Sequence, residues 1–105
     1  HTAYRRQRQM CIRDRDGAKH HSLKYPAADE PVIYPLTTDV IIVLGTWEKG
    51  KLCKDVVFRY ELMQNELGMA EDVVVDDSVI DTLRQVYVKK LRDSGFEGRI
   101  STYYR

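Results

Sequence analysis

The sequence predicts an α+β fold, in which a small sheet packs against one or two amphipathic helices. Three observations lead to this prediction. Residues 40–44 are five consecutive aliphatic side chains, residues 77–93 repeat apolar side chains at helical spacing, and residues 99–104 are rich in β-branched and aromatic side chains. We expect the two strands to pair and the helices to cover them, within a single domain at residues 31–105.

The first fifteen residues have a separate explanation. Residues 9–15 read Gln-Met-Cys-Ile-Arg-Asp-Arg, the translation expected from the end sequence used in transposase-based library preparation. Because an ordered match of this length is rare by chance, we expect residues 1–15 to be an adapter-derived, disordered segment outside the fold. The natural start of the chain would then lie elsewhere. The alternative is a natural basic arm that binds nucleic acid or acidic lipid.

The net charge depends on whether that segment is counted. The chain has 17 basic and 16 acidic residues, and residues 1–15 supply five of the basic and one of the acidic ones. The rest therefore carries 12 basic against 15 acidic side chains, so total charge gives no argument for a polyanionic partner. Cys53 is the one thiol outside the segment, which favours a reducing, cytoplasmic compartment. The longest apolar run is far shorter than the ~20 residues of a membrane span, so no membrane partner is expected.

Residues 16–30 are expected to form an extended lead-in. Prolines stand at 26 within this segment and at 31 and 35 shortly after it, and each removes a backbone donor and disfavours helix before it. Residues 32–34 add at most a short edge strand. His20 and His21 are adjacent, but no third ligand stands at a recognisable spacing, so we predict neither a metal site nor a cofactor.

Residues 39–45 predict the central strand, because a short, mostly β-branched aliphatic run suits a strand buried on both faces. Residues 52–67 fit two patterns. One helical arc collects most of their apolar side chains and Gly68 stands at the C-cap, which favours a helix over residues 53–67. Alternation from Leu52 to Leu62 instead predicts, for residues 51–60, a strand that returns through a turn at residues 48–50.

Residues 77–93 form the clearest helix. Asp77 or Ser78 can cap its first turn, cations near its last turn complement the helix dipole, and Gly95 ends it. The following residues, 99–104, are expected to pair with the central strand. The apolar stripe of the helix consists of Val79, Ile80, Leu83, Val86, Tyr87 and Leu91.

A phosphate-loop spacing follows the central strand, with Gly45, Gly50 and Lys51 at the G-x-x-x-x-G-K positions. However, Leu52 stands where a Mg²⁺-binding hydroxyl belongs, and Glu48 would repel an anion in the loop. A degenerate phosphate-binding loop is therefore kept as one alternative. The simpler interpretation is an ordinary turn containing glycine.

The charges of the second half are unevenly distributed. Seven acids and no base lie between residues 61 and 81, and we interpret them as solvated and helix-capping groups, because no calcium-loop motif is present. Bases prevail beyond residue 83, where a basic helix end precedes a strand with Arg and Tyr, a combination suited to phosphates and bases. The candidate nucleic-acid contacts are Arg84, Lys89, Lys90, Arg92, Arg99, Tyr103 and Tyr104.

The order helix, Gly68, helix, Gly95, strand over residues 53–105 is similar to that of a winged helix, although the connection at residues 69–76 is longer than a helix-turn-helix turn. No acid, base, nucleophile or metal ligand occurs at a telling spacing, so no catalytic residue is predicted. Our main hypothesis is a non-catalytic accessory or protein-interaction domain, a role that a fragment of a larger protein would also fit. The alternatives are a winged-helix-like nucleic-acid-binding module and a degenerate phosphate-binding loop domain.

Overall fold

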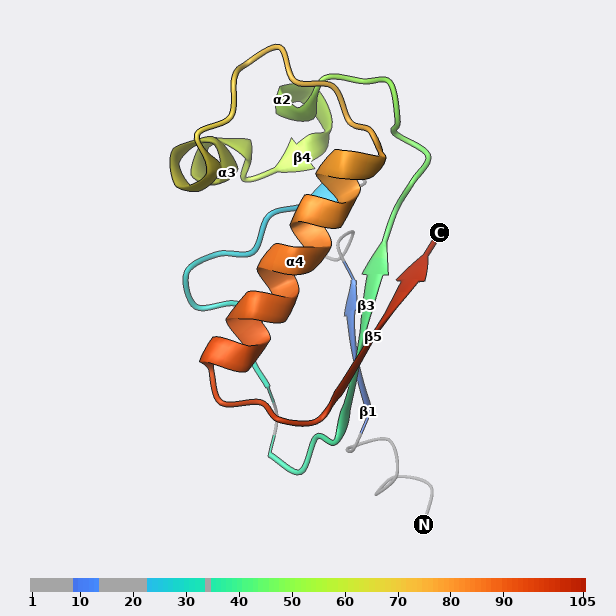
Figure 1. The fold of residues 1–105 in the computed structure, drawn as a ribbon, viewed down its shortest axis with the longest axis vertical. Helices are drawn as coiled ribbons and strands as arrows, with labels where there is room; N and C mark the ends of the chain where they lie inside the picture. Colours follow the sequence, from blue (N-terminus) through green and yellow to red (C-terminus); the bar gives the residue numbers. More distant parts are fainter. Residues whose placement is uncertain (1–8, 14–22, 34) are drawn as a thin grey trace.

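The computed structural model describes residues 9–13, 23–33 and 35–105, and it confirms the predicted α+β class (Figure 1). Strands β1, β3 and β5 form a parallel sheet in which β3 is central, and β2 pairs with β4 in a separate two-stranded parallel sheet. In chain order the elements are β1 (Gln9–Arg13), β2 (Leu23–Lys24), β3 (Asp39–Leu44), α2 (Cys53–Val56), β4 (Val57–Phe58), α3 (Tyr60–Leu67), α4 (Asp77–Asp93) and β5 (Arg99–Tyr104).

The main core lies between the sheet and α4. The even-numbered side chains of β3, Val40, Ile42 and Leu44, are completely buried, because successive side chains of a strand point to opposite faces and this face meets the helix. Leu83 and Tyr87 of α4 are buried in the same cluster. The predicted packing of the helical stripe against the central strand is therefore confirmed, and β5 pairs with β3 as expected.

Helix α4 has the predicted bounds, but its cap lies one residue earlier than predicted. The extended backbone of Asp76 allows its carboxylate to accept a hydrogen bond from the Val79 amide at 2.9 Å. At the other end the chain leaves the helix through Gly95, whose φ of +98° is readily adopted only by glycine.

Residues 52–67 follow neither of the two predicted patterns over their full length. A four-residue helix, α2, gives way to the two-residue strand β4, and the eight-residue helix α3 follows. The break is at Arg59, a non-glycine residue with φ of +66°. Its guanidinium donates hydrogen bonds to the Tyr25 carbonyl at 3.4 Å and to the Glu30 carboxylate at 3.1 Å, and these tertiary contacts accompany the left-handed backbone.

The N-terminal part is more structured than the sequence indicated. Leu23 and Tyr25 are buried in the core, so the core extends beyond the predicted boundary at residue 31. Strand β1 pairs along β3 and its Ile12 packs against the core, which differs from the expectation that residues 1–15 are disordered. The adapter origin of residues 1–15 stays a prediction. Val32 and Ile33 form no strand, and His20 and His21 lie outside the described residues.

Candidate interaction surface

The predicted nucleic-acid contacts on α4 are largely engaged by neighbouring groups. Arg84 pairs with Asp81 at 2.9 Å and Lys89 with Asp93 at 2.7 Å, and the hydrogen bond that Lys89 donates to Asp93 raises the pKa of Lys89. Arg92 donates to two backbone carbonyl oxygens in the turn after the helix, at 3.1 and 2.8 Å. Local partners thus take up much of the hydrogen-bonding capacity that a phosphate would need.

The remaining predicted contacts do not form one surface. Lys90 borders a cavity of about 270 Å³ that Tyr25 and Glu66 also line. Arg99 and Tyr103 point to the face of the sheet away from α4, whereas Tyr104 points to the opposite side, because side chains alternate along β5. The structure therefore distributes this set over three regions.

The segment with phosphate-loop spacing folds as a turn whose amides bond within the protein. The Gly50 amide donates to the Val75 carbonyl at 2.9 Å, and the Lys51 amide donates to the Glu48 carbonyl at 3.1 Å. The Lys51 ammonium pairs with the Glu48 carboxylate at 2.7 Å. Gly45 is buried at the end of β3. The two amides and the Lys51 ammonium, which a phosphate-binding loop would direct toward its ligand, therefore bond within the protein instead.

A cavity of about 380 Å³ lies at the carboxyl end of the parallel sheet, the position where open α/β sheets commonly bind ligands. Tyr104 and Thr46 line it from the sheet side. Asp77 and Asp81 line it from the first turns of α4, and Lys49, the one cation in the lining, forms an ion pair with Asp77. Two carboxylates against one paired cation do not favour a phosphate.

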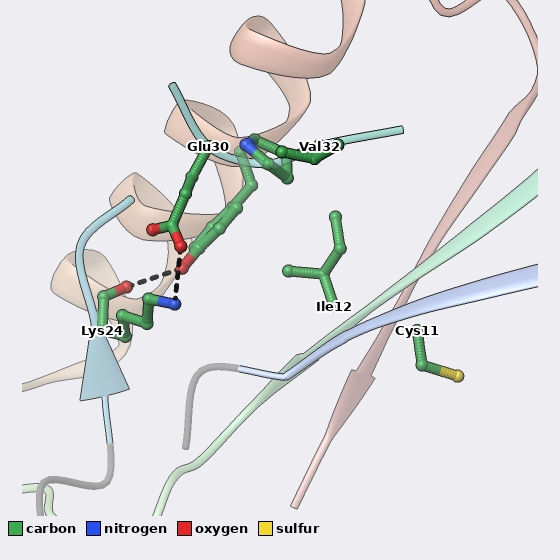
Figure 2. Close-up of a pocket in the computed structure, with 7 residues that line it drawn as sticks. Cys11, Ile12, Lys24, Glu30 and Val32 are labelled. Atoms are coloured by element: carbon green, nitrogen blue, oxygen red, sulfur yellow. Dashed lines mark hydrogen bonds and ion pairs between the residues drawn. The ribbon is translucent and has the colours of Figure 1, made fainter. Parts of the chain in front are cut away.

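A second cavity, of about 220 Å³, lies between β1, the segment after β2 and Tyr87 of α4 (Figure 2). Ile12 and Cys11 leave β1 in different directions there. Lys24 pairs with Glu30 at 3.1 Å, and the Tyr87 hydroxyl donates to the Lys24 carbonyl at 2.8 Å. The polar groups of this cavity therefore bond to one another.

Glu30 is the centre of that network. Burial raises the pKa of its carboxyl group, but the hydrogen bond from the Ala27 amide and the charges of Lys24 and Arg59 outweigh burial and lower it. The Arg59 guanidinium is 3.1 Å from the carboxylate. Such an arrangement fixes the segment between β2 and β3 to the start of α3, which is a structural role.

The face of the sheet away from α4 has a different character. Here the odd-numbered side chains form rows across the strands: Cys11, Ile41 and Ser101 in one row, and Val43 beside Tyr103 in the next. Ile41 is half-buried, Val43 is 7% exposed and Tyr103 is 60% exposed, yet Ile41 and Val43 do not belong to the main core cluster. We call this surface the open face, because no described helix packs against it (Figure 1).

Strand β5 forms one edge of the same sheet. The Arg99 amide donates to the Thr38 carbonyl at 3.0 Å and the Arg105 amide donates to the Leu44 carbonyl at 2.8 Å. The backbone N–H and C=O groups of the odd-numbered residues of β5 therefore point toward β3. In a parallel pair the even-numbered residues between them then direct their N–H and C=O groups away from β3. The β5 edge, defined by the backbone of Ile100, Thr102 and Tyr104, pairs with no other described strand (Figure 1).

The open face is not among the surfaces predicted from the sequence. The aliphatic run predicts a strand buried on both faces, which would place Ile41 and Val43 in the core. A signal was nevertheless present: the run does not alternate, so it requires cover on both sides, while a single long helix was clearly predicted.

Two further observations apply to residues 9–13, 23–33 and 35–105. Their His, Cys, Asp and Glu side chains form no group of three or more that could hold a metal ion. Nor do they include a helix with the length and apolar character needed to cross a membrane.

Comparison with known proteins gives one match. The model of a family described as YqeC protein matches residues 2–61, which is more than half of the chain. The matched range contains β1 to β4 and ends at the start of α3, before α4 and β5. No curated protein and no solved structure matches. The family description names no activity or ligand.

Proposed function

The chain belongs to the YqeC family, and we propose that it is a non-catalytic protein-interaction domain that binds a partner on the open face of its sheet. The observation that carries the proposal is the uneven cover of a parallel sheet. Helix α4 buries one face, whereas the described residues place no helix on the other.

Parallel sheets as a rule are covered on both faces, and their strands then read as continuous aliphatic runs. Strand β3 has such a run, and its Ile41 and Val43 belong to the side away from α4, where Val43 is 7% exposed and Ile41 is half-buried. A strand adapted to water on one face would instead alternate apolar and polar side chains. The composition of β3 therefore supports a second covering layer, which a partner protein would supply.

The composition of the open face suits a protein contact. Its centre is apolar, the neighbouring Cys11 and Ser101 are small, and the charged pair of Arg99 and Asp39 stands at one end with 3.7 Å between nitrogen and oxygen. An apolar centre with a polar rim is the usual anatomy of protein interfaces. Tyr103 is an exposed aromatic side chain of the kind that commonly contributes most to binding energy.

The titratable groups with shifted pKa values support a non-catalytic role, because packing explains them. Burial raises the pKa of Tyr25, and the hydrogen bond that its hydroxyl donates to Glu66 at 2.6 Å raises it further. Burial, followed by the charge of Asp76, raises the pKa of the Cys53 thiol. A protonated, buried thiol is a poor nucleophile.

We also propose that the protein acts in the cytoplasm. The two cysteines, Cys11 and Cys53, are both free, and a reducing compartment keeps thiols in that state. Exposed Cys11 would be open to oxidation elsewhere.

A matched pair of variants tests the binding surface. Binders selected from a displayed library of peptides and small helical proteins are mapped on the ¹⁵N-labelled protein by chemical-shift changes, which we expect at Ile41, Val43 and Tyr103. Tyr103→Ala should weaken binding at least about tenfold, as loss of an aromatic side chain that carries much of the binding energy does. Val32→Ala is the control, because Val32 is also 60% exposed but lies on a different segment. Binders that map elsewhere, or equal effects of the two variants, would refute the proposal.

The nucleic-acid alternative is tested in the same series. Titration with single-stranded and duplex DNA at low and moderate salt should show no specific binding. Binding that weakens steeply with salt, and that Lys89→Ala combined with Lys90→Ala abolishes, would replace the proposed function with nucleic-acid binding.

A further inference from the structure

We infer that the β5 edge accepts an extended, acidic segment of a partner protein, which joins the sheet as an additional antiparallel strand. The inference rests on the proposed function, since it requires a protein partner, and it specifies how that partner is recognised. Main-chain hydrogen bonds would provide affinity and the flanking side chains would select the sequence, as in other cases of strand addition.

The first step is the set of backbone groups at the edge. Ile100, Thr102 and Tyr104 direct their N–H and C=O groups away from β3, and no other described strand pairs with them. Their side chains point to the α4 side of the sheet, where Ile100 packs against the core. An added strand would therefore meet backbone groups that the packed side of β5 holds in position.

The second step is that this edge lacks the devices that usually prevent strand addition. Exposed edges are commonly blocked by proline, by a bulge or by a charged side chain in the strand. Residues 100–104 contain neither proline nor charge, and β5 keeps a continuous register with β3 over its six residues. The charges stand at the two ends, at Arg99 and Arg105.

The third step is the charge on the partner strand that Arg99 and Arg105 favour. Residues 99, 101, 103 and 105 would occupy the positions of an antiparallel pair that lack hydrogen bonds, where opposed side chains approach most closely. The Arg99 side chain is 83% exposed and its contact with Asp39 is long, at 3.7 Å. Acidic side chains opposite Arg99 and Arg105 would be favourable, as would a β-branched one opposite Tyr103.

The same charges argue against a second copy of this chain as the occupant. Antiparallel addition of β5 to its own copy, centred on Thr102, uses the whole strand and sets Arg99 opposite Arg105 at both ends. Like charges directly opposite each other are destabilising in a sheet. A partner strand with acids at these two positions removes the conflict.

A synthetic peptide tests the inference directly. The capped, fluorescently labelled peptide Glu-Thr-Val-Thr-Val-Thr-Glu places its acids opposite Arg105 and Arg99 and its three Thr residues opposite the outward-facing backbone. We expect saturable binding to the whole protein by fluorescence anisotropy, with chemical-shift changes along β5. A matched peptide with Lys in place of Glu should bind at least about fivefold more weakly, since two opposite-charge pairs become like-charge pairs.

Backbone methylation distinguishes strand addition from general electrostatic attraction. N-methylation of the three Thr residues removes the donors that face β5 and should abolish binding. N-methylation of the two Val residues alters donors that face away and should change affinity less than about twofold, because those groups make no bond to the protein.

Two protein variants complete the test. Arg99→Glu combined with Arg105→Glu should reverse the preference between the Glu and Lys peptides. Thr102→Pro removes an outward donor without removing a bond to β3, and should abolish binding while the protein stays folded. If Thr102→Pro does not fold, the methylated peptides decide the matter alone.

Three results would overturn the inference: no binding of the Glu peptide, equal loss from both methylation patterns, or concentration-dependent dimerisation through β5 seen by analytical ultracentrifugation. Its failure is distinguishable from that of the proposed function. Selected binders that map to the open face while the Glu peptide does not bind would leave the proposed function intact and refute this inference alone.

Discussion

Replacing Leu83 by alanine tests the packing on which the sheet surface depends. Leu83 is completely buried in α4, in the same cluster as the even-numbered side chains of β3. Burial on all sides limits how far the neighbours can collapse into the space left behind, so we expect a loss of about 2–5 kcal/mol in the free energy of unfolding. With a total stability of about 5–15 kcal/mol, typical for such a domain, this is a large fraction.

The assay is urea denaturation followed by circular dichroism. With a slope of about 1–3 kcal/mol/M, a loss near 3 kcal/mol should move the midpoint by roughly 1–3 M without changing the slope. Leu67→Ala is the control, because Leu67 lies on α3 and is 38% exposed, and it should cost far less. A loss below about 1 kcal/mol for Leu83→Ala, or equal losses for both variants, would show that α4 does not bury β3 as described.

Three further predictions concern polar groups. Asp76→Ala should lower the free energy of unfolding by about 1 kcal/mol, because it removes the cap of α4, whereas Asp77→Ala should cost less, as chemical denaturation can show. The pKa of Glu30 is lowered in the folded protein, so the contribution of its carboxylate to the free energy of unfolding is present above about pH 4.3 and is lost as pH falls. Glu30→Gln should make stability depend less on pH in this acidic range. The pKa of Tyr25 is raised by burial, so the contribution of Tyr25 to the free energy of unfolding is present below about pH 10 and is lost as pH rises further. Tyr25→Phe should weaken that loss of stability at alkaline pH, measured by thermal unfolding between pH 9 and 11. An unchanged loss at alkaline pH would contradict the assignment.

The elements that the sequence predicted well are those with a strong local period. The aliphatic run ending at Leu44 and the stripe of α4 each admit one interpretation, and the structure has both elements at the predicted positions. Residues 52–67 admit two, because the deciding feature is the left-handed backbone of Arg59. A positive φ at a residue other than glycine leaves no mark in the sequence, and here its side-chain partners, Tyr25 and Glu30, lie far away along the chain.

The candidate surface was less predictable than the fold. Charge along the chain grouped Arg84 with Arg99 and Tyr103, but the alternation of β5 and the position of α4 separate them in space. The sequence predicts an extended lead-in at Tyr25, because the burial of this side chain depends on contacts with β4 and α3 that no local pattern shows. Whether residues lie on the same surface depends on the tertiary fold, and their spacing along the chain does not predict it.

The contrast between β3 and β5 bears on what covers the sheet. In β5 the residues on the open face differ in kind, with the polar Ser101 beside the aromatic Tyr103. In β3 the residues on the open face, Ile41 and Val43, are as aliphatic as those toward α4. On this face Val43 is 7% exposed and Tyr103 is 60% exposed, so a covering partner gains most apolar contact at Tyr103, beside the β5 edge whose backbone groups remain to be satisfied. If the two surfaces act together, a single partner would lay apolar side chains over Tyr103 and Ile41 and extend a strand along β5.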